Sequence, residues 1–479
     1  MEARARSFKQ NATHALHDAQ LQRAMNSAGG GFIERRRVAA GKLPEFEQLR
    51  DEARDIKNHT LAYLDLYYER YEDKVRASGG HVHYAPTAAD AREIILQICR
   101  DADAKTVTKG KSMIAEEVAL NPFLEENDIT PIETDLGEYI IQLRNEAPSH
   151  IIAPAIHLNK DQVEADFRRV HTDLPEDRNL DEPVALVREA RTVLREKFLA
   201  ADVGITGANF LIAETGTSVI VTNEGNGDLT QSLPRVHIVL TSLEKMVPTL
   251  EDVSTILRLL ARTATGQEMS VYTTFSTGPR HEGDPDGPEE YHVVVLDNGR
   301  SSMLGSQFQD MLRCIRCGAC MNHCPVYQSV GGHAYGWVYP GPMGAVLTPS
   351  LIGIDQSGHL PNASTFCGRC EAVCPMRIPL PKMMRHWRER EFERNLAPAT
   401  MRGGLGFWKF FASRPRLYHL AASLAIPFLS LLAGRRGRMR VLPFASGWTR
   451  HRDLPAPQGR TFQQLWRDRQ AGVTREAKR

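Results

Sequence analysis

The sequence predicts an α/β domain with a mostly parallel sheet, followed by a smaller helical domain that carries most of the cysteines. Between residues 81 and 300, β-rich runs alternate with amphipathic helical runs, the pattern of parallel strands joined by helices. Residues 301–395 have Gly- and Pro-rich joints and hold seven of the eight cysteines. A helical N-terminal extension (residues 1–80) and a helical, Arg-rich tail (residues 396–479) complete the expected organisation.

The individual elements follow from the periodicity of apolar residues. In the N-terminal extension they recur at helical spacing up to Gly79 and Gly80, so we expect helices that pack on the next domain. The expected strands cover residues 81–86, 105–110, 129–135, 149–156, 209–215, 217–223, 236–242, 270–277 and 290–297. The expected helices cover residues 87–102, 112–127, 136–143, 182–201 and 253–265, with Thr87 and Ser112 as N-caps of the first two. The tight junction at residues 213–220 predicts a local antiparallel hairpin.

Composition and charge exclude several classes of function. Lys and Arg total 59 and Asp and Glu total 58, so the net charge of +1 does not indicate nucleic acid as a partner. No strand is followed by a G-x-G-x-x-G loop, which leaves a nicotinamide site unsupported. The chain opens without an apolar secretory signal, and its clustered cysteines do not resemble a disulfide framework. We therefore expect a cytoplasmic protein. Cys99, alone among apolar residues, is expected to be a small buried hydrophobe.

One apolar segment in the tail requires a membrane test. Residues 417–434 are apolar, but His419 and Pro427 interrupt them. The segment falls short of the ~20 apolar residues that a spanning helix needs. We expect a buried helix or helix pair. The alternative is a peripheral contact with a membrane or a partner subunit, which the following Arg-rich run would suit.

The first cysteine stretch, CIRCGACMNHCP (residues 314–325), has the spacing C-x-x-C-x-x-C-x-x-x-C-P. This is the run that bacterial ferredoxins use to bind iron–sulfur clusters. Three cysteines at steps of three surround one cluster, while the fourth reaches a second cluster. Zinc is the main rival for C-x-x-C pairs. Four cysteines with a terminal proline, echoed downstream, favour iron–sulfur clusters over zinc.

The second stretch, STFCGRCEAVCP (residues 364–375), has three cysteines and a serine where the first stretch begins with a cysteine. The expected cofactors are two 4Fe–4S clusters with exchanged fourth ligands. Cluster 1 is expected to take Cys314, Cys317, Cys320 and Cys374, and cluster 2 to take Cys324, Cys367 and Cys370. The fourth ligand of cluster 2 falls at Ser364, a poor substitute for a thiolate. Cluster 2 therefore has three protein sulfurs and one uncertain position.

Two polar turns are weaker candidates for a ligand pocket. In the first, Glu214 is a candidate acid or base, and Thr215, Gly216 and Thr217 could cradle an anion. The alternative is an ordinary hairpin with glycine at a positive φ. In the second, Lys109 and Lys111 lie between a strand and a helix, where anions often bind. The alternative there is a solvated loop.

Several sequence segments are typical of one protein family, among them KGKSM, ETDLGEYIIQL, AETGTSVIVTNEGNGDL, STGPR and CGRCEAVCP. Over nearly its whole length the chain resembles the lactate utilization protein B family. The resemblance implies a LUD domain with a sheet like that of sugar-phosphate isomerases and CoA-transferases (the NagB/RpiA-like fold), and a ferredoxin-type module. It also implies a part in oxidising L-lactate to pyruvate. The implied partners are a heterodisulfide-reductase-like Cys-rich protein and a second LUD protein. In this family a serine at position 364 is normal.

These observations favour an electron-transfer subunit of a lactate-oxidising complex. The alternative from another class is a regulatory protein whose α/β domain binds a metabolite and whose clusters report redox state. A third hypothesis places catalysis in this chain, because an iron with three cysteine ligands can keep an open position for a hydroxy acid. Reduction by lactate during turnover separates a carrier from a sensor.

Overall fold

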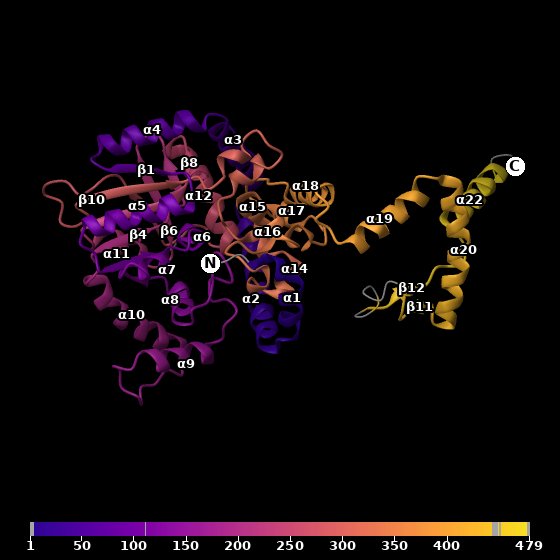
Figure 1. Cartoon of the computed structure of the whole chain (residues 1–479), viewed down its shortest axis with the longest axis horizontal. Coiled ribbons are helices and arrows are strands. Elements are labelled where there is room, and N and C mark those ends of the chain that lie inside the picture. Colours follow the sequence, from indigo (N-terminus) through magenta and orange to yellow (C-terminus); the bar gives the residue numbers. More distant parts are fainter. Residues whose placement is uncertain (1–3, 111, 443–448, 450–451, 477–479) are drawn as a thin grey trace. The chain divides into compact units, whose positions relative to one another are not determined.

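The computed structural model describes residues 4–110, 112–442, 449 and 452–476. They form two compact units, Met1–Glu391 and Phe392–Arg479 (Figure 1). The first unit contains the α/β domain, the cysteine-bearing domain and the N-terminal helices, so the contacts among these three parts can be described together.

The main sheet has six parallel strands in the order β1-β10-β7-β4-β2-β3, which confirms the predicted parallel sheet. Their bounds are His81–Ala85 (β1), Thr106–Gly110 (β2), Thr130–Glu133 (β3), Val203–Thr206 (β4), Val236–Ser242 (β7) and Glu290–Leu296 (β10). The sequence prediction missed β4. This strand has only four residues and contains Gly204, which weakens its β signal. The glycine is needed because a Cβ there would lie 1.8 Å from the carbonyl oxygen of Thr230 in α11 (Asn226–Ser232).

The strand expected at residues 149–156 is wrong. The Ser149 N–H donates to the Pro154 carbonyl, which closes a turn. The Ser149 carbonyl accepts a hydrogen bond from Tyr327 (2.7 Å), and His150 contacts Asn322 (3.0 Å). The polar groups of this segment therefore bind the cysteine-bearing domain instead of a neighbouring strand.

Helices cover one face of the main sheet, and helix α4 with a second sheet covers the other (Figure 1). The covering helices are α4 (Leu64–Ala77), α5 (Ala88–Asp101), α6 (Met113–Glu117) and α7 (Leu120–Glu125). Thr87 caps α5 and Ser112 caps α6, as predicted. The single helix expected at residues 112–127 is divided at Ala119, which has a φ of +53°. Cys99 is fully buried in the core under α5, as predicted.

The second sheet has four strands in the order β8-β5-β6-β9. Their bounds are Phe210–Ile212 (β5), Thr217–Thr222 (β6), Met246–Val247 (β8) and Tyr272–Ser276 (β9). Strands β5 and β6 pair antiparallel around Gly216, whose φ is +72°, so the predicted hairpin is confirmed. The remaining helices of this domain are α8 (Leu136–Leu143), α9 (Lys160–Val170), α10 (Pro183–Leu199) and α12 (Leu250–Ala264).

The N-terminal extension contacts the cysteine-bearing domain as well as the α/β domain. It comprises α1 (Phe8–His17), α2 (Ala19–Gly41), α3 (Phe46–Ala62) and α4. Helices α2 and α3 pack on α12, and α4 packs on β1. The cysteine-bearing domain consists of short helices: η4 (Gln309–Arg313), α13 (Ala319–Asn322), α14 (Pro325–Val330), η5 (His333–Tyr335), α15 (Gly341–Ile352), α16 (Ile354–Ser357), α17 (Arg369–Ala372) and α18 (Leu380–Glu393). Helices α1 and α2 pack on η5 and α14, so one core runs through both parts.

In the second unit, the described helices are α19 (Ala399–Ala412), α20 (Pro415–Ala433) and α22 (Phe462–Glu476). We expected a buried helix in this region, but helix α20 is mostly exposed. Among its described residues Ala433 is buried, whereas the large apolar side chains of α20 are exposed. By length and composition α20 is also apolar enough to cross a membrane, despite the interruptions at His419 and Pro427.

A buried network of charges joins the α/β domain to the first cysteine loop. Arg300, 1% exposed and placed after β10, donates two hydrogen bonds to the carboxylate of Glu117 (2.9 and 2.7 Å). Its Nε lies 2.9 Å from Oε2 of Glu244. Glu244 also accepts a hydrogen bond from Arg316 (3.1 Å), and the Tyr339 hydroxyl donates to Glu117 (2.6 Å).

The opposite charges keep both carboxylates of this network ionised. Burial by itself would raise the pKa of Glu117, but Arg300 outweighs burial and lowers it. Burial likewise opposes ionisation of Glu244, yet Arg300 and Arg316 lower its pKa to about 2. Loss of one arginine would leave buried, uncompensated negative charge.

We therefore expect Arg300→Met to lower the free energy of unfolding by about 3–5 kcal/mol, the usual effect of removing one partner from a buried ion pair. Urea unfolding of the anaerobically purified protein measures this loss. Arg76→Ala is the matched control, because Arg76 pairs with Glu72 on the surface and should change stability by about 0.5 kcal/mol or less. Equal shifts for the two variants would contradict a structural role for the network.

Candidate metal centre and adjoining cavity

The two cysteine stretches form loops of the same backbone shape. In the first loop Arg316 and Gly318 have φ values of +59° and +73°, and in the second loop Phe366 and Gly368 have values of +53° and +80°. Each pair flanks the second position of its motif, and a short helix, α13 or α17, follows directly. Ser364 therefore holds the place in the second loop that Cys314 holds in the first.

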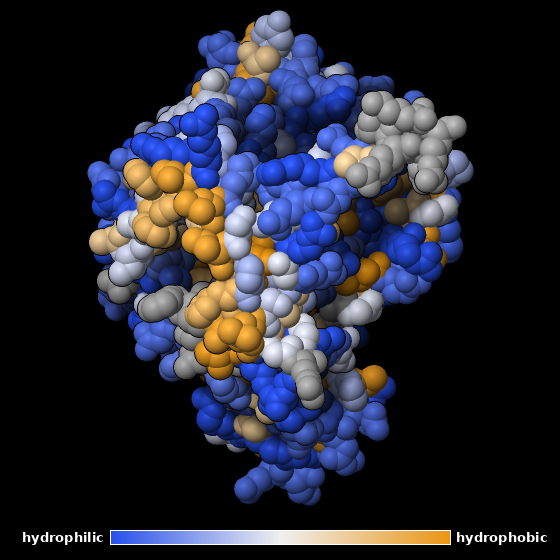
Figure 2. Space-filling view, turned by 90° about the vertical axis from the view of Figure 1, so that its right-hand side faces the viewer, coloured by the Kyte–Doolittle hydropathy of each residue, from blue (hydrophilic) through white to orange (hydrophobic). Residues whose placement is uncertain are grey.

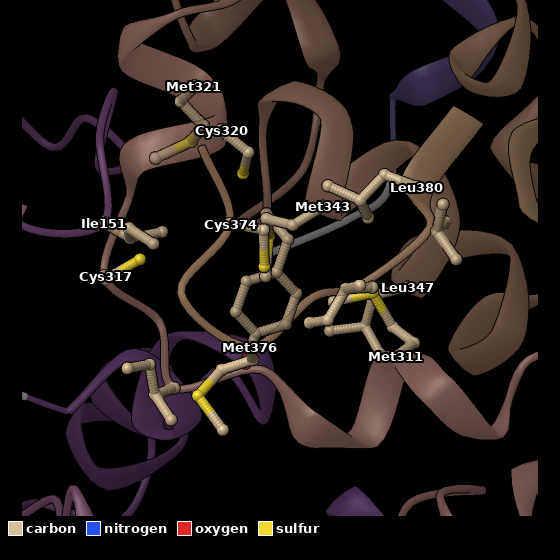
Figure 3. Packing of buried hydrophobic residues seen from close by; sticks show 14 of the residues in the cluster. Ile151, Met311, Cys317, Cys320, Met321, Met343, Leu347, Cys374, Met376 and Leu380 are labelled. Carbon is tan, nitrogen blue, oxygen red and sulfur yellow. The ribbon is translucent and has the colours of Figure 1, made fainter. Parts of the chain in front are cut away.

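The first three cysteines of the first stretch line one cavity together with the last cysteine of the second stretch. These residues are Cys314, Cys317, Cys320 and Cys374. Apolar side chains, including Ile151, Met311, Met376 and Leu380, complete the lining. Figure 3 shows Cys317, Cys320 and Cys374 around a common space among these apolar residues.

A second cavity is lined by Cys324 from the first stretch and by Cys367, Cys370 and Ser364 from the second. The Ser364 hydroxyl accepts a hydrogen bond from the Phe366 N–H (3.1 Å). Each cavity is thus lined by cysteines of both stretches. The second set is the more open, because Cys367 is exposed.

The chemistry of these donors fits iron–sulfur clusters. Burial raises the pKa of Cys317 and Cys320 above the ordinary value, and it raises the pKa of Cys370 to about 12 and of Cys374 to about 11. Buried thiols of this kind become thiolates when metal ions supply the compensating positive charge. Cys367 differs, because the Arg369 N–H lowers its pKa. Four soft sulfur donors in an apolar cavity suit a 4Fe–4S cluster.

Arginines of the N-terminal helices hold the second stretch in place. Arg50, buried on α3, donates to the carbonyl oxygens of Cys374 (2.7 Å) and Ala372 (2.7 Å). Arg36 on α2 donates to the carbonyl of Val373 (2.8 Å). These contacts fix the loop that carries Cys374 and place positive charge near sulfur ligands whose cluster would be anionic.

A larger cavity opens beside the first cysteine cavity, at the carboxyl ends of β2, β3, β4 and β7. Its empty space, mouth included, is about 1110 Å³. Its polar lining includes Ser112, Asp135, Glu138, Lys245 and Arg316. Ile151, Arg316 and Cys317 line both this cavity and the first cysteine cavity, so the two share a wall. Ligands of open α/β sheets bind at the carboxyl ends of strands.

No sequence pattern indicated Lys245 or Arg316 as candidate site residues. Lys245 follows the end of β7 directly, which is the signal that could have identified it. Arg316 lies between two cysteines of the first motif. The motif constrains only the cysteines, so it does not indicate a role for the arginine between them.

The predicted anion site at Lys109 is occupied by carboxylates. Lys109 is 1% exposed, and its Nζ lies 2.6 Å from Glu133 and 3.2 Å from Glu116. Burial opposes the charge, but the two carboxylates raise the pKa of Lys109 above the ordinary value. Its positive charge is therefore already balanced within the protein. Lys111 lies outside the described residues.

The predicted cradle at residues 214–217 is the tip of the β5–β6 hairpin. A Cβ on Gly216 would lie 2.6 Å from the Val75 backbone, so the turn packs tightly against the end of α4. The Thr215 hydroxyl bonds to that of Thr217, and the Glu214 carboxylate accepts from the Leu250 N–H (3.3 Å). None of these four described residues lines the three cavities above.

The serine in the second loop leads to a prediction about cluster stability. With serine oxygen in place of a thiolate, the cluster in the second cavity should lose one iron on mild oxidation before the other cluster is damaged. EPR should detect the resulting 3Fe–4S signal. Ser364→Cys should suppress this signal, because it supplies a fourth sulfur at the open position.

Three variants control that experiment. Ser302→Cys adds a thiol to an exposed surface position and should leave the 3Fe–4S signal unchanged. Cys324→Ala should abolish the signal, whereas Cys374→Ala should damage the other cluster. Iron loss that is unaffected by Ser364→Cys would place the fourth ligand elsewhere.

Comparison with known proteins agrees with this architecture. The family model of the LUD domain matches residues 68–296, and that of the 4Fe-4S dicluster domain matches residues 310–378. The model described as lactate utilisation protein B, C-terminal, matches residues 369–471.

Curated relatives match over nearly the whole chain. Lactate utilization protein B of Bacillus pumilus is 40% identical over 472 residues, covering 98% of this chain and 99% of that protein. The protein of the same name from Geobacillus thermodenitrificans is 43% identical over 445 residues, covering 92% of each. A crystal structure of a DUF162 family protein from Deinococcus radiodurans covers 49% of this chain and 98% of its own, at 18% identity and a TM-score of 0.26. From its full-length relatives, the chain belongs to the lactate utilization protein B family.

Proposed function

We propose that this chain transfers electrons during the oxidation of L-lactate to pyruvate, within a complex of lactate utilization proteins. The observation that carries the proposal is the pair of cysteine-lined cavities in one compact unit. Cys320 lines the first cavity and Cys324, four residues later in the chain, lines the second. Clusters held at such neighbouring sites would be close enough for electrons to pass between them.

The cluster content and ligand pairing belong to the same proposal. When bound, each cluster supplies a site for one electron, so a pair can receive the two electrons of lactate oxidation in steps. The lining of the two cavities supports the exchanged fourth ligands, with Ser364 beside the three-sulfur set. Exposure of Cys367 favours the second set as the one that exchanges electrons with a partner.

The partners and the finer fold are inferred from the family. We infer that the complex contains a heterodisulfide-reductase-like Cys-rich protein and a second LUD protein, and that it acts in the cytoplasm. The parallel six-stranded sheet supports a NagB/RpiA-like fold for the LUD domain. The second candidate function is a redox- or metabolite-sensing regulator. A sensor would use the same two clusters, and the large cavity of the α/β domain could hold its metabolite.

The test is reduction of the clusters by L-lactate. The reconstituted chain should be reduced when the two partner proteins are present, at a rate that matches lactate oxidation, because a carrier takes part in every turnover. Absorbance and EPR follow the clusters, and pyruvate formation gives the overall rate.

Metal analysis and a ligand variant control this experiment. The chain should contain iron and acid-labile sulfide for two clusters and negligible zinc, whereas stoichiometric zinc without sulfide would refute the iron–sulfur assignment. Cys320→Ala should prevent reduction and slow pyruvate formation together. Pyruvate formation at the normal rate with Cys320→Ala would favour a sensor over a carrier.

A further inference from the structure

Lys245 is a buried residue that has no partner in the part of the chain that the structure describes. It ends the turn η2 (Leu243–Lys245) that follows β7, is 6% exposed, and lines the large cavity. No hydrogen bond or ion pair from any residue that the structure describes reaches its ammonium group. Burial and then Arg316 lower the pKa of Lys245 to about 8. An ammonium group that lines a cavity and has no partner among the described residues is available to bind an anion.

Arg316 lines the same cavity and also has hydrogen-bonding capacity to spare. Its Nη2 donates to Glu244, and its guanidinium lies 4.5 Å from the centre of the Tyr339 ring. Its Nη1 is buried with no partner among the described residues. Arg316 lies in the first cysteine loop, and its contacts with Glu244 and Tyr339 hold its side chain in place.

Two acidic residues, Asp135 and Glu138, also line the cavity. Burial, followed by the nearby carboxylates of Glu133 and Asp135, raises the pKa of Glu138 well above its ordinary value, which favours the neutral form of this group. A protonated carboxyl group can donate a hydrogen bond to an oxygen atom of a ligand. The lining therefore combines two cations with polar groups suited to a small oxygen-rich acid.

We propose that this cavity binds L-lactate and pyruvate, with Lys245 and Arg316 holding the carboxylate. The choice of these acids rests on the proposed function. The prediction of a carboxylate rests on Lys245, which has no partner among the described residues, and on the unpaired Nη1 of Arg316. Because Cys317 lines both cavities, an acid bound here lies beside a cysteine that would hold the first cluster. The inference assigns substrate recognition to this chain, between its LUD domain and its cysteine loop.

Isothermal titration calorimetry of the full, anaerobically reconstituted chain tests this assignment without turnover. L-Lactate and pyruvate should each bind, and Lys245→Gln should weaken binding by about 10–100-fold, the value of a charge-assisted hydrogen bond. Lys42→Gln, which removes an exposed positive charge, should leave the affinity unchanged. Equal affinities for wild type and Lys245→Gln would overturn the proposal.

A series of ligands tested on the wild-type chain decides whether the cavity binds a carboxylate, even if the Lys245→Gln variant does not fold. Lactamide has the hydroxyl group without the negative charge and should not compete with L-lactate. Competition by lactamide, or tighter binding of inorganic phosphate than of either acid, would overturn the carboxylate assignment. Lys245-dependent binding without cluster reduction in the presence of the partners would refute the proposed function alone. Cluster reduction without binding of either acid to this chain would refute the pocket alone.

A separate observation concerns the second unit of the chain. Residues 392–479 contain 17 Lys and Arg against 4 Asp and Glu, although the whole chain has a net charge of +1. Positive charge is thus concentrated in the tail. Its helix α20 has 19 residues and a mean hydropathy of 1.4. Large apolar side chains of α19 and α20 are exposed, among them Phe407, Trp408, Leu424, Phe428, Leu431 and Leu432.

We infer that α19 and α20 bind an anionic lipid surface. Figure 2 shows apolar surface bordered by strongly polar surface on one face of the molecule. Arg414 and Arg416 lie at the start of α20, and Arg436, Arg438 and Arg440 follow its end. Apolar side chains flanked at both ends by arginines match a helix that lies at a membrane interface, where acidic head groups attract the basic residues.

Vesicle flotation with the full chain tests the lipid surface. Vesicles of phosphatidylcholine with phosphatidylglycerol should bind the chain at least about 10-fold more tightly than pure phosphatidylcholine, and salt should weaken the binding. The double variant Leu424→Glu and Phe428→Glu should lose binding, whereas Leu199→Glu, at an exposed position on α10, should retain it. No preference for anionic vesicles, or binding of the tail only to an acidic partner protein, would overturn the inference.

Discussion

The buried pairing of Arg300 with Glu117 and Glu244 is the interaction on which the first unit depends. It joins the loop after β10, the helix α6 and the turn after β7 at one point. Arg316 extends the network into the first cysteine loop through the same Glu244. Because Arg300, Glu117 and Glu244 are buried, none of these three charges can move without leaving another uncompensated. The sheet and the cysteine loop are therefore held in a fixed relation.

This fixed relation gives the large cavity its composition. One side is built from the carboxyl ends of parallel strands, where an α/β domain ordinarily binds its ligand. Another side is the cysteine loop itself, which contributes Arg316 and Cys317. In a chain with two independent domains these features would be far apart. Here the large cavity and the first cysteine cavity share a wall. A candidate ligand site and a candidate metal site can therefore lie next to each other without a connecting loop.

The N-terminal helices hold the two cysteine stretches against each other. A cavity that takes Cys374 from the second stretch requires that stretch to be held against the first. Arg50 and Arg36 hold the second stretch by donating hydrogen bonds to its backbone carbonyl oxygens. These contacts do not depend on which side chains the loop carries. The extension thus supports the candidate metal centre as well as the α/β domain.

The sequence by itself determined the features that depend on nearby residues. Cysteine spacing, the β5–β6 hairpin, the caps at Thr87 and Ser112 and the alternation of strands and helices are all local, and the structure has them. Tertiary structure decided the rest, because the deciding contacts are distant in sequence. Glu117 and Arg300 are 183 positions apart, the turn at residues 149–154 depends on Tyr327, and Lys109 is neutralised by Glu133 on the neighbouring strand. The cavity of Lys245 and Arg316 likewise exists only where the sheet meets the cysteine loop.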